Sequence, residues 1–265
     1  MASFSVVSNI ASANAQANLS TNSVSLNRTL NRLSSGFRIN YSGDDAAGLA
    51  VANGYRTDVA ILNQGIRNAN DGLSTLQIKD GALNNISTLL DRLATLASQS
   101  ASAGFAGNRG TLDDEAQTIL DEIDREAGVA GLTASSAFSV FVSSGGSATV
   151  GGTIGAADTT GLSLTGIDLS SNTAAATAVG TIGAAVSTLG SVQGSVGALE
   201  NRLQYAISLG QSQMVNTKAA ESRIRDANIA EESANMTRYS ILNQSGIASL
   251  AQANQQSSSV LALLR

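Results

Sequence analysis

The stretch LNQGIRNANDGLSTLQIKDGALNNISTLLDRLATLA, residues 62–97, decides the fold class. Asp80 interrupts its apolar positions, which otherwise recur at steps of three, four and seven residues: Leu62, Ile66, Ala69, Leu73, Leu76, Leu83, Leu90, Leu93 and Ala97. A seven-residue repeat of this kind is typical of a helix that packs lengthwise against other helices. We therefore predict a helix over about residues 58–98, roughly 60 Å long at the usual rise per residue.

Two further segments have helical patterns. A shorter helix is predicted over residues 112–127, with Thr111 as its N-cap and acidic residues in its first turn, where the helix dipole favours them. A second long seam runs through Val192, Val196, Leu199, Leu203, Ile207, Gly210, Met214, Thr217, Glu221 and Ile224. The predicted fold is mainly α, a long antiparallel helical coiled-coil bundle to which both ends of the chain contribute.

The middle of the chain differs in composition. Residues 131–189 carry only two charges, Asp158 and Asp168, and are rich in Gly, Ser, Thr and Val. The runs 140–142 and 148–150 flank a Gly-Gly turn and predict a β-hairpin near 138–150. The remainder is of low complexity, and no regular structure is assigned to it. We expect a small β-rich or irregular insertion at the tip of the bundle.

The composition excludes several classes of function. The chain of 265 residues has a formal net charge of −5, which argues against nucleic-acid binding. It contains no Cys and no His, so zinc sites built on thiolate or imidazole, and Ser-His-Asp or Cys-His catalysis, are excluded. We expect no enzyme, cofactor or metal. No apolar run approaches the roughly 18 residues of a membrane span, and the N-terminus lacks the basic region of a cleaved signal peptide, since the first basic residue is Arg28.

Both ends of the chain are amphipathic but weakly apolar, because Ala, Ser and Asn interrupt the large residues. Two such helices are not expected to be stable alone. Further copies of the same chain would supply the missing surface most simply. The residues expected to make these self-assembly contacts are Leu19, Leu26, Leu30, Leu33, Phe37, Ile241, Leu242, Ile247, Leu250, Leu261 and Leu264.

Three blocks of sequence closely resemble a known family. They are LNRTLNRLSSGFRINYSGDDAAGLAVANGYR at 26–56, DGLSTLQIKDGALNNISTLLDRLATLASQSAS at 71–102 and AESRIRDANIAEESANMTRYSILNQSGIASLAQANQQSSSVLALLR at 220–265. The first two resemble the N-terminal region of bacterial flagellins, and the third resembles their C-terminal region. The resemblance covers residues 1–130 and 190–265, and the middle of the chain has no family pattern to match.

The resemblance implies a domain organisation. Residues 1–44 and 226–265 would form an inner helical domain that lines the filament core. Residues 45–130 and 190–225 would form a helical bundle with the β-hairpin. The segment 131–189 would be a short variable outer part, in which Ser and Thr at 133–177 are candidates for O-glycosylation.

The resemblance also implies a function and a location. The chain would be a structural subunit that leaves the cell through the flagellum's type III export channel, without a cleaved signal peptide, and polymerises into the extracellular filament. Its partners would be further copies of itself, an export chaperone on the C-terminal helix, and filament cap and junction proteins. Neither nucleic acid nor membrane is expected as a partner. A hook–filament junction protein of the same family, and a secreted coiled-coil adhesin or effector from another class, remain the alternatives.

Individual residues take roles from the same resemblance. Asp44 and Asp45 lie where flagellins join their inner and outer domains, and Asp44 is expected to cap a helix that begins at Asp45. Arg92, Leu96 and Glu115 match positions through which many flagellins engage a vertebrate Toll-like receptor. The alternative places Leu96 in the core and the two charges in salt bridges or solvent. For Arg225, where flagellins commonly have an acid, we consider pairing with Glu231 or Glu232, or a contact between subunits.

Overall fold

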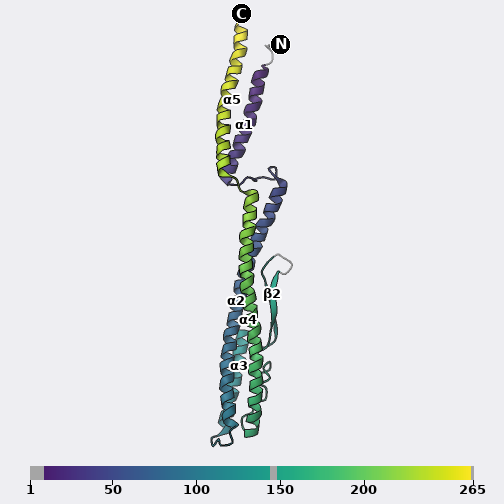
Figure 1. The fold of residues 1–265 in the computed structure, drawn as a ribbon, viewed down its shortest axis with the longest axis vertical. Helices are drawn as coiled ribbons and strands as arrows, with labels where there is room; N and C mark the ends of the chain where they lie inside the picture. Colours follow the sequence, from purple (N-terminus) through teal and green to yellow (C-terminus); the bar gives the residue numbers. More distant parts are fainter. Residues whose placement is uncertain (1–8, 144–147, 264–265) are drawn as a thin grey trace. The chain divides into compact units, whose positions relative to one another are not determined.

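The computed structural model describes residues 9–143 and 148–263, with side chains described as far as Gln256. Five helices and one two-stranded antiparallel sheet account for most of these residues (Figure 1). In chain order they are α1 (Ile10–Ser35), α2 (Ala46–Ser100), α3 (Arg109–Ala130), β1 (Ser136–Phe141), β2 (Thr149–Ile154), α4 (Asn172–Arg225) and α5 (Ile229–Leu263). The prediction of a mainly helical chain with a small β-hairpin is confirmed.

The chain divides into two compact units. Residues 1–57 and 217–265 make one, called the terminal unit here, and residues 58–216 make the other, called the central unit. Helices α2 and α4 each contribute residues to both units. Both ends of the chain therefore belong to the same unit.

The core of the central unit is built on the predicted seam of α2. Leu76, Leu83 and Leu90 have no exposed surface, and they pack with apolar residues of α3 and α4. Full burial of a leucine side chain contributes about 1.5–3 kcal/mol, so this face holds the three helices together. The chain has no proline to interrupt α2.

Helix α4 begins well before its predicted seam. Its buried positions continue the seam backwards from Val192 at alternating steps of three and four residues, through Leu189, Ala185, Ile182, Ala178 and Ala175. Three of these five positions are alanines, which pack closely but do not mark a heptad pattern as clearly as large apolar residues do. The same composition gives α4 an 18-residue stretch with a mean hydropathy of 1.4, sufficient by length and composition to span a membrane, contrary to the sequence expectation. The seam residues of α4 are instead part of the helical core.

Helix α3 has different ends from those predicted. Asn108, and not Thr111, is its N-cap, because the Asn108 side chain accepts a hydrogen bond from the Gly110 amide at 2.9 Å. The helix ends at Gly131, whose φ of 63° lies in the left-handed region that favours glycine. The Lys79 ammonium of α2 donates to the Ala130 and Gly131 carbonyls at 2.8 and 3.0 Å, which satisfies acceptors at this helix end.

The β-hairpin packs along α2 and α4 rather than at the end of the bundle. Its register pairs Val140 with Val150. Glycines on the helices let the hairpin come close: a Cβ added at Gly72 would lie 2.7 Å from a Val140 methyl group, and one at Gly65 would lie within 2.0 Å of the Val142 carbonyl oxygen. The predicted turn at 143–146 lies largely outside the described residues.

Residues 155–171, the strap, follow the hairpin and cover the core without regular structure. Leu164 and Leu169 are fully buried. The Asp124 carboxylate of α3 accepts hydrogen bonds from the Thr159 amide and hydroxyl at 2.8 and 2.9 Å, and Asp113 accepts one from the Leu169 amide at 2.8 Å. These contacts to α3, together with a hydrogen bond from the Ser100 hydroxyl of α2 to the Leu169 carbonyl, fix an apolar segment that has no periodic sequence pattern.

The change Asp124→Ala is expected to destabilise the central unit by about 1–3 kcal/mol, because two donors on Thr159 lose a charged acceptor. Urea unfolding followed by circular dichroism measures the loss. Asp121→Ala on the same helix is the matched control and is expected to be neutral, since Asp121, exposed like Asp124, makes no side-chain hydrogen bond among the described residues. Equal stability of the two variants would mean that this anchor does not hold the strap.

Glu200 of α4 carries an unusual carboxylate. Its Oε1 atom is buried and has no hydrogen-bond partner among the described residues. Burial, together with the nearby Asp80 carboxylate of α2, raises the pKa of Glu200. The Glu200 carboxyl group therefore stays protonated to a higher pH in the folded state than in the unfolded state. Stability is lost as the pH rises through the folded-state pKa, and it is regained as the pH falls.

Glu200→Gln is accordingly expected to raise the free energy of unfolding at pH 7, by less than about 1 kcal/mol because solvent screens a partly exposed group. The gain should shrink as the pH falls from 7 towards the ordinary glutamate pKa of about 4.3, since wild-type Glu200 becomes neutral there. Urea unfolding of both proteins across this range measures the difference. A gain independent of pH would contradict the explanation.

Candidate self-assembly surface

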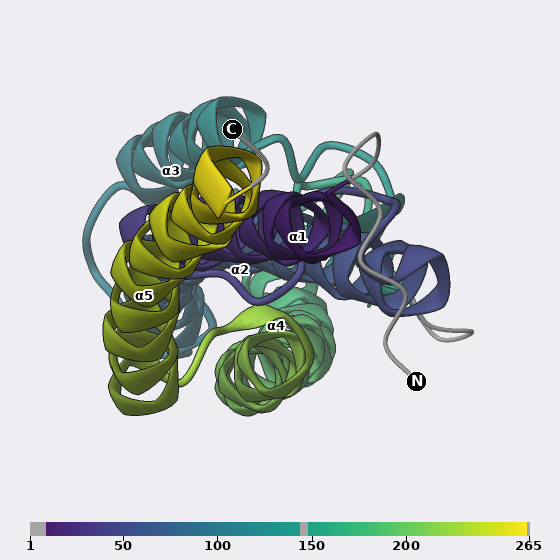
Figure 2. The same cartoon turned by 90° about the horizontal axis from the view of Figure 1, so that it is seen from above.

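Helices α1 and α5 form an antiparallel pair and lie side by side in both views (Figures 1 and 2). Polar side chains set their register. The Asn9 side-chain amide donates to the Ala253 carbonyl at 2.9 Å, and the Asn243 side-chain amide donates to the Ser23 hydroxyl at 3.1 Å. Directional contacts of this kind specify how the two helices align, although each adds only about 1 kcal/mol.

An ion-pair cluster closes one end of the helix pair. Arg32 of α1 lies 3.3 Å from Glu232 of α5 and 3.9 Å from the Asp44 carboxylate. Glu232 is only 8% exposed, so its charge needs this partner. Sequence reasoning missed this cluster. A possible signal was Arg32 itself, one of only two charged residues in α1.

The terminal unit has almost no apolar core. Among the side chains described in it, only Ile39 and Ala52 are buried apolar residues. Leu19, Leu26, Leu33, Phe37 and Leu250 are partly exposed. The side chains of Leu261 and Leu264 lie outside the described residues. Pairing α1 with α5 thus covers these predicted assembly residues only in part.

Other predicted assembly residues are more exposed. Ile241 is 60% exposed, Ile247 is 56% exposed, Leu242 is 41% exposed and Leu30 is 40% exposed. Full burial of each such side chain would contribute about 1.5–3 kcal/mol. Exposed aliphatic residues on both helices of a pair without a core indicate a surface that another molecule covers.

The two aspartates before α2 have different roles. Asp45, not Asp44, caps the helix: α2 begins at Ala46, and the Asp45 carboxylate accepts from the Gly48 amide at 2.8 Å. The Asp44 carboxylate turns instead towards the preceding loop, where it accepts from the Asn40 and Tyr41 amides at 3.3 and 3.4 Å. The expected helix start at Asp45 was one residue early, because the first aspartate stabilises the turn.

Arg225 does not pair with Glu231 or Glu232. Its guanidinium lies 4.2 Å from the centre of the Phe37 ring, a cation–π contact. The backbone joins the same two segments, since the Arg38 amide donates to the Arg225 carbonyl at 2.7 Å. Local spacing suggested an ion pair within one helical segment, but the fold brings an aromatic residue from the other end of the chain to Arg225.

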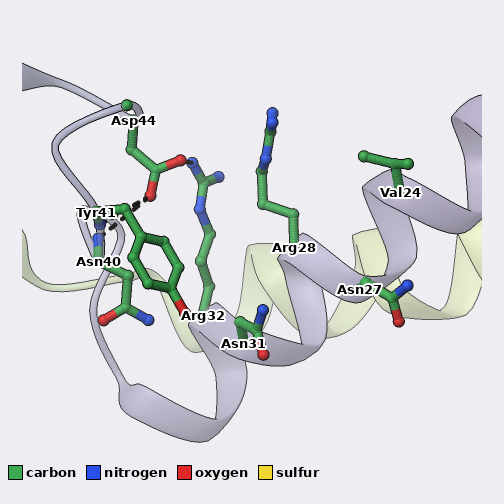
Figure 3. A pocket seen from close by; sticks show the side chains of 9 residues that line it. Val24, Asn27, Arg28, Asn31, Arg32, Asn40, Tyr41 and Asp44 are labelled. Atoms are coloured by element: carbon green, nitrogen blue, oxygen red, sulfur yellow. Dashed lines mark hydrogen bonds and ion pairs between the residues drawn. The ribbon is translucent and has the colours of Figure 1, made fainter.

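A groove of about 420 Å³, the α1 groove, lies beside the turn after α1 (Figure 3). One helical face and the loop that carries Asp44 supply its walls. It is lined by Val24, Asn27, Arg28, Asn31, Arg32, Asn40, Tyr41, Gly43 and Asp44. Most of the lining residues are polar, but apolar atoms, including those of Val24 and Tyr41, supply much of the surface.

The predicted receptor residues belong to the central unit. Arg92 and Glu115 are brought together, with the Arg92 Nε atom 3.0 Å from a Glu115 carboxylate oxygen, and both side chains are partly exposed. Leu96 is only 1% exposed and belongs to the core. The prediction of Leu96 as a contact residue fails in this conformation, because a partner molecule cannot reach a buried side chain. Within the described ranges, no cluster of three or more acidic residues could hold a metal ion.

Comparisons with known proteins agree with this architecture. The family model described as the bacterial flagellin N-terminal helical region matches residues 6–131, and that of the bacterial flagellin C-terminal helical region matches residues 179–264. The flagellin of Halalkalibacterium halodurans is 35% identical over 97% of this chain and 98% of its own length. The flagellar filament 33 kDa core protein of Treponema phagedenis is 34% identical over 95% of this chain and 96% of its own length. The flagellin of Bacillus subtilis is 32% identical, with 97% and 98% covered. The chain therefore belongs to the bacterial flagellin family.

Proposed function

We propose that this chain is a structural subunit that is exported from the cell and polymerises into the flagellar filament. The observation that carries the proposal is the incomplete core of the terminal unit. Helices α1 and α5 pair with each other, yet Leu30, Ile241 and Ile247 remain exposed on them. Packing between subunits would bury these residues and complete the core.

Polymerisation of identical chains explains why both helices carry apolar surface. In a head-to-tail arrangement, each copy presents one surface to the copy before it and a different surface to the copy after it. Such contacts build an open helical filament when the rotation between copies does not close a ring. The exposed aliphatic residues on α1 and α5 would let each subunit contact both the preceding and the following copy.

The two alternatives are less well supported. A hook–filament junction protein shares the terminal domains, but it would not build a long polymer alone. A secreted coiled-coil adhesin or effector would account for the heptad pattern, but not for relatives that match along nearly the whole chain. Formation of long filaments from the purified chain distinguishes the proposed function from both.

Export implies further partners. Before assembly, Ile241, Leu242 and Ile247 of α5 are exposed to water. We expect an export chaperone to cover this helix in the cytoplasm, and cap and junction proteins to contact the terminal unit during growth. The assembled filament would be extracellular.

Negative-stain electron microscopy tests the proposal. Purified chain is dissociated by heat, cooled with short filament seeds and imaged beside a variant that lacks residues 1–20. Smooth filaments are expected from the full-length chain only, because the variant loses much of α1 and with it the partner of α5. A full-length chain that stays monomeric with seeds would contradict the proposed function.

A further inference from the structure

The α1 groove holds a cation without a counter-ion. Arg28 lines the groove, and its side chain extends away from α1 (Figure 3). Within the described residues, Arg28 makes no hydrogen bond or ion pair, whereas Arg32 beside it pairs with both Asp44 and Glu232. Val24 and Tyr41, also in the lining, are 58% and 65% exposed. The groove therefore offers one free positive charge between apolar contacts.

The two units of the chain have opposite charge. The terminal unit contains nine Lys and Arg against six Asp and Glu, a net charge of +3, and the central unit contains six against fourteen, a net charge of −8. Opposite charges favour contact between the terminal unit of one copy and the central unit of another.

Helix α3 carries most of the negative charge of the central unit. It has seven carboxylates against two arginines. Five of the seven already have partners within the chain: Asp113, Glu115, Glu122, Asp124 and Glu126. The other two, Asp114 and Asp121, are exposed and have no side-chain partner among the described residues. They are seven positions apart on one face, about 10 Å along the helix, with exposed Thr118 between them.

We propose that the α1 groove of one subunit receives the Asp114–Asp121 face of α3 from a second copy, with Arg28 pairing one of these carboxylates. The inference rests on the proposed function and adds the contact that orients neighbouring subunits. Seven other acidic residues belong to the central unit. Exposed Asp71 and Asp91 stand singly on α2, and Asp80 and Glu200 are partly buried. Asp158 and Asp168 accept hydrogen bonds from nearby backbone amides, and Asp58 also has a partner. Within the described part of the central unit, only α3 offers two free carboxylates on one face. Asn27 and Asn31 in the groove add side-chain donors and acceptors.

Cysteine cross-linking tests the contact, because the natural chain contains no cysteine. The double variant Asn31→Cys, Thr118→Cys is assembled and treated with a short bis-maleimide. Covalent ladders are expected from filaments and not from dissociated monomers. The pair Asn31→Cys, Ser195→Cys is the control, since Ser195 is an exposed residue of α4, and it should give no ladder. Filaments of the first variant that give no ladder would overturn the proposal.

Charge reversal tests the same contact without cross-linking. Arg28→Glu is expected to raise the monomer concentration in equilibrium with filaments about tenfold, which corresponds to about 1.4 kcal/mol. Arg56→Glu makes the same charge change on exposed Arg56 of α2, in the same unit but outside the groove, and should change that concentration less than about twofold. Combining Arg28→Glu with Asp114→Arg and Asp121→Arg should restore assembly. Circular dichroism of each monomer confirms that it is folded.

The outcomes separate the two proposals. Normal assembly by Arg28→Glu, or no recovery by the combined variant while its monomer is folded, would overturn the groove contact and leave the proposed function intact. Failure of the wild-type chain to form filaments would remove the proposed function, and this inference with it.

Discussion

Replacing Ile241 and Ile247 by aspartate is expected to abolish filament growth and to leave the stability of the monomer nearly unchanged. Both side chains are more than half exposed in the isolated chain, so the monomer loses little packing. Within a filament, each would lose about 1.5–3 kcal/mol of apolar burial, and a buried unpaired charge would add a further cost. We expect the equilibrium monomer concentration to rise more than about a hundredfold.

Sedimentation of assembly mixtures measures this effect, and urea unfolding measures the stability of the monomer. The matched control introduces two charges at Ser187 and Ser195, exposed polar positions of α4 in the central unit, and is expected to retain assembly. Filament growth by the Ile241→Asp, Ile247→Asp variant at the wild-type concentration would show that these side chains stay in contact with water.

The second large effect concerns the core of the central unit. Leu90→Ala is expected to lower the free energy of unfolding by about 2–5 kcal/mol, because Leu90 is fully buried and its removal leaves a cavity. Leu30→Ala in α1 is the matched comparison and should cost less than about 1 kcal/mol in the monomer, since Leu30 is 40% exposed. Equal losses in urea unfolding would contradict the assignment of the monomer's stability to the central unit.

The sequence predicted those helices whose seams carry large residues. Leucines at heptad positions of α2 made its pattern visible, and Leu76, Leu83 and Leu90 are fully buried as expected. The first third of α4 was missed because Ala175, Ala178 and Ala185 occupy its seam. Each alanine buries little apolar area. These positions are therefore recognised as part of the core only once the packing of the three helices is known.

The sequence pattern did not predict contacts between segments that are far apart in the chain. The strap has no periodicity, and its burial depends on Asp113 and Asp124 of α3. Likewise, Arg225 was assigned acidic neighbours a helical turn or two away, whereas Phe37 from the other end of the chain occupies that position. The contact of Arg225 with Phe37 accompanies an isolated β-bridge between Phe37 and Asp226, which joins segments that are far apart in the sequence.

The sequence identified the self-assembly surface only in part, because the exposure of each residue depends on the fold. Weak amphipathicity correctly indicated that α1 and α5 need more surface than they supply to each other. It did not separate partly covered Leu19 from exposed Ile241. A motif match likewise placed Leu96 among contact residues without information on its burial, which the three-helix core determines.

Hydrogen–deuterium exchange, compared between monomer and filament, tests most directly the claim that the terminal unit completes its core through other copies. We expect fast exchange of the backbone amides of residues 10–35 and 229–256 in the monomer and slow exchange in the filament. Amides of residues 76–97 and 182–203 should be protected in both states, because the central unit has its own core. Equal protection of α1 and α5 in the two states would show that contacts with other copies do not complete the terminal unit.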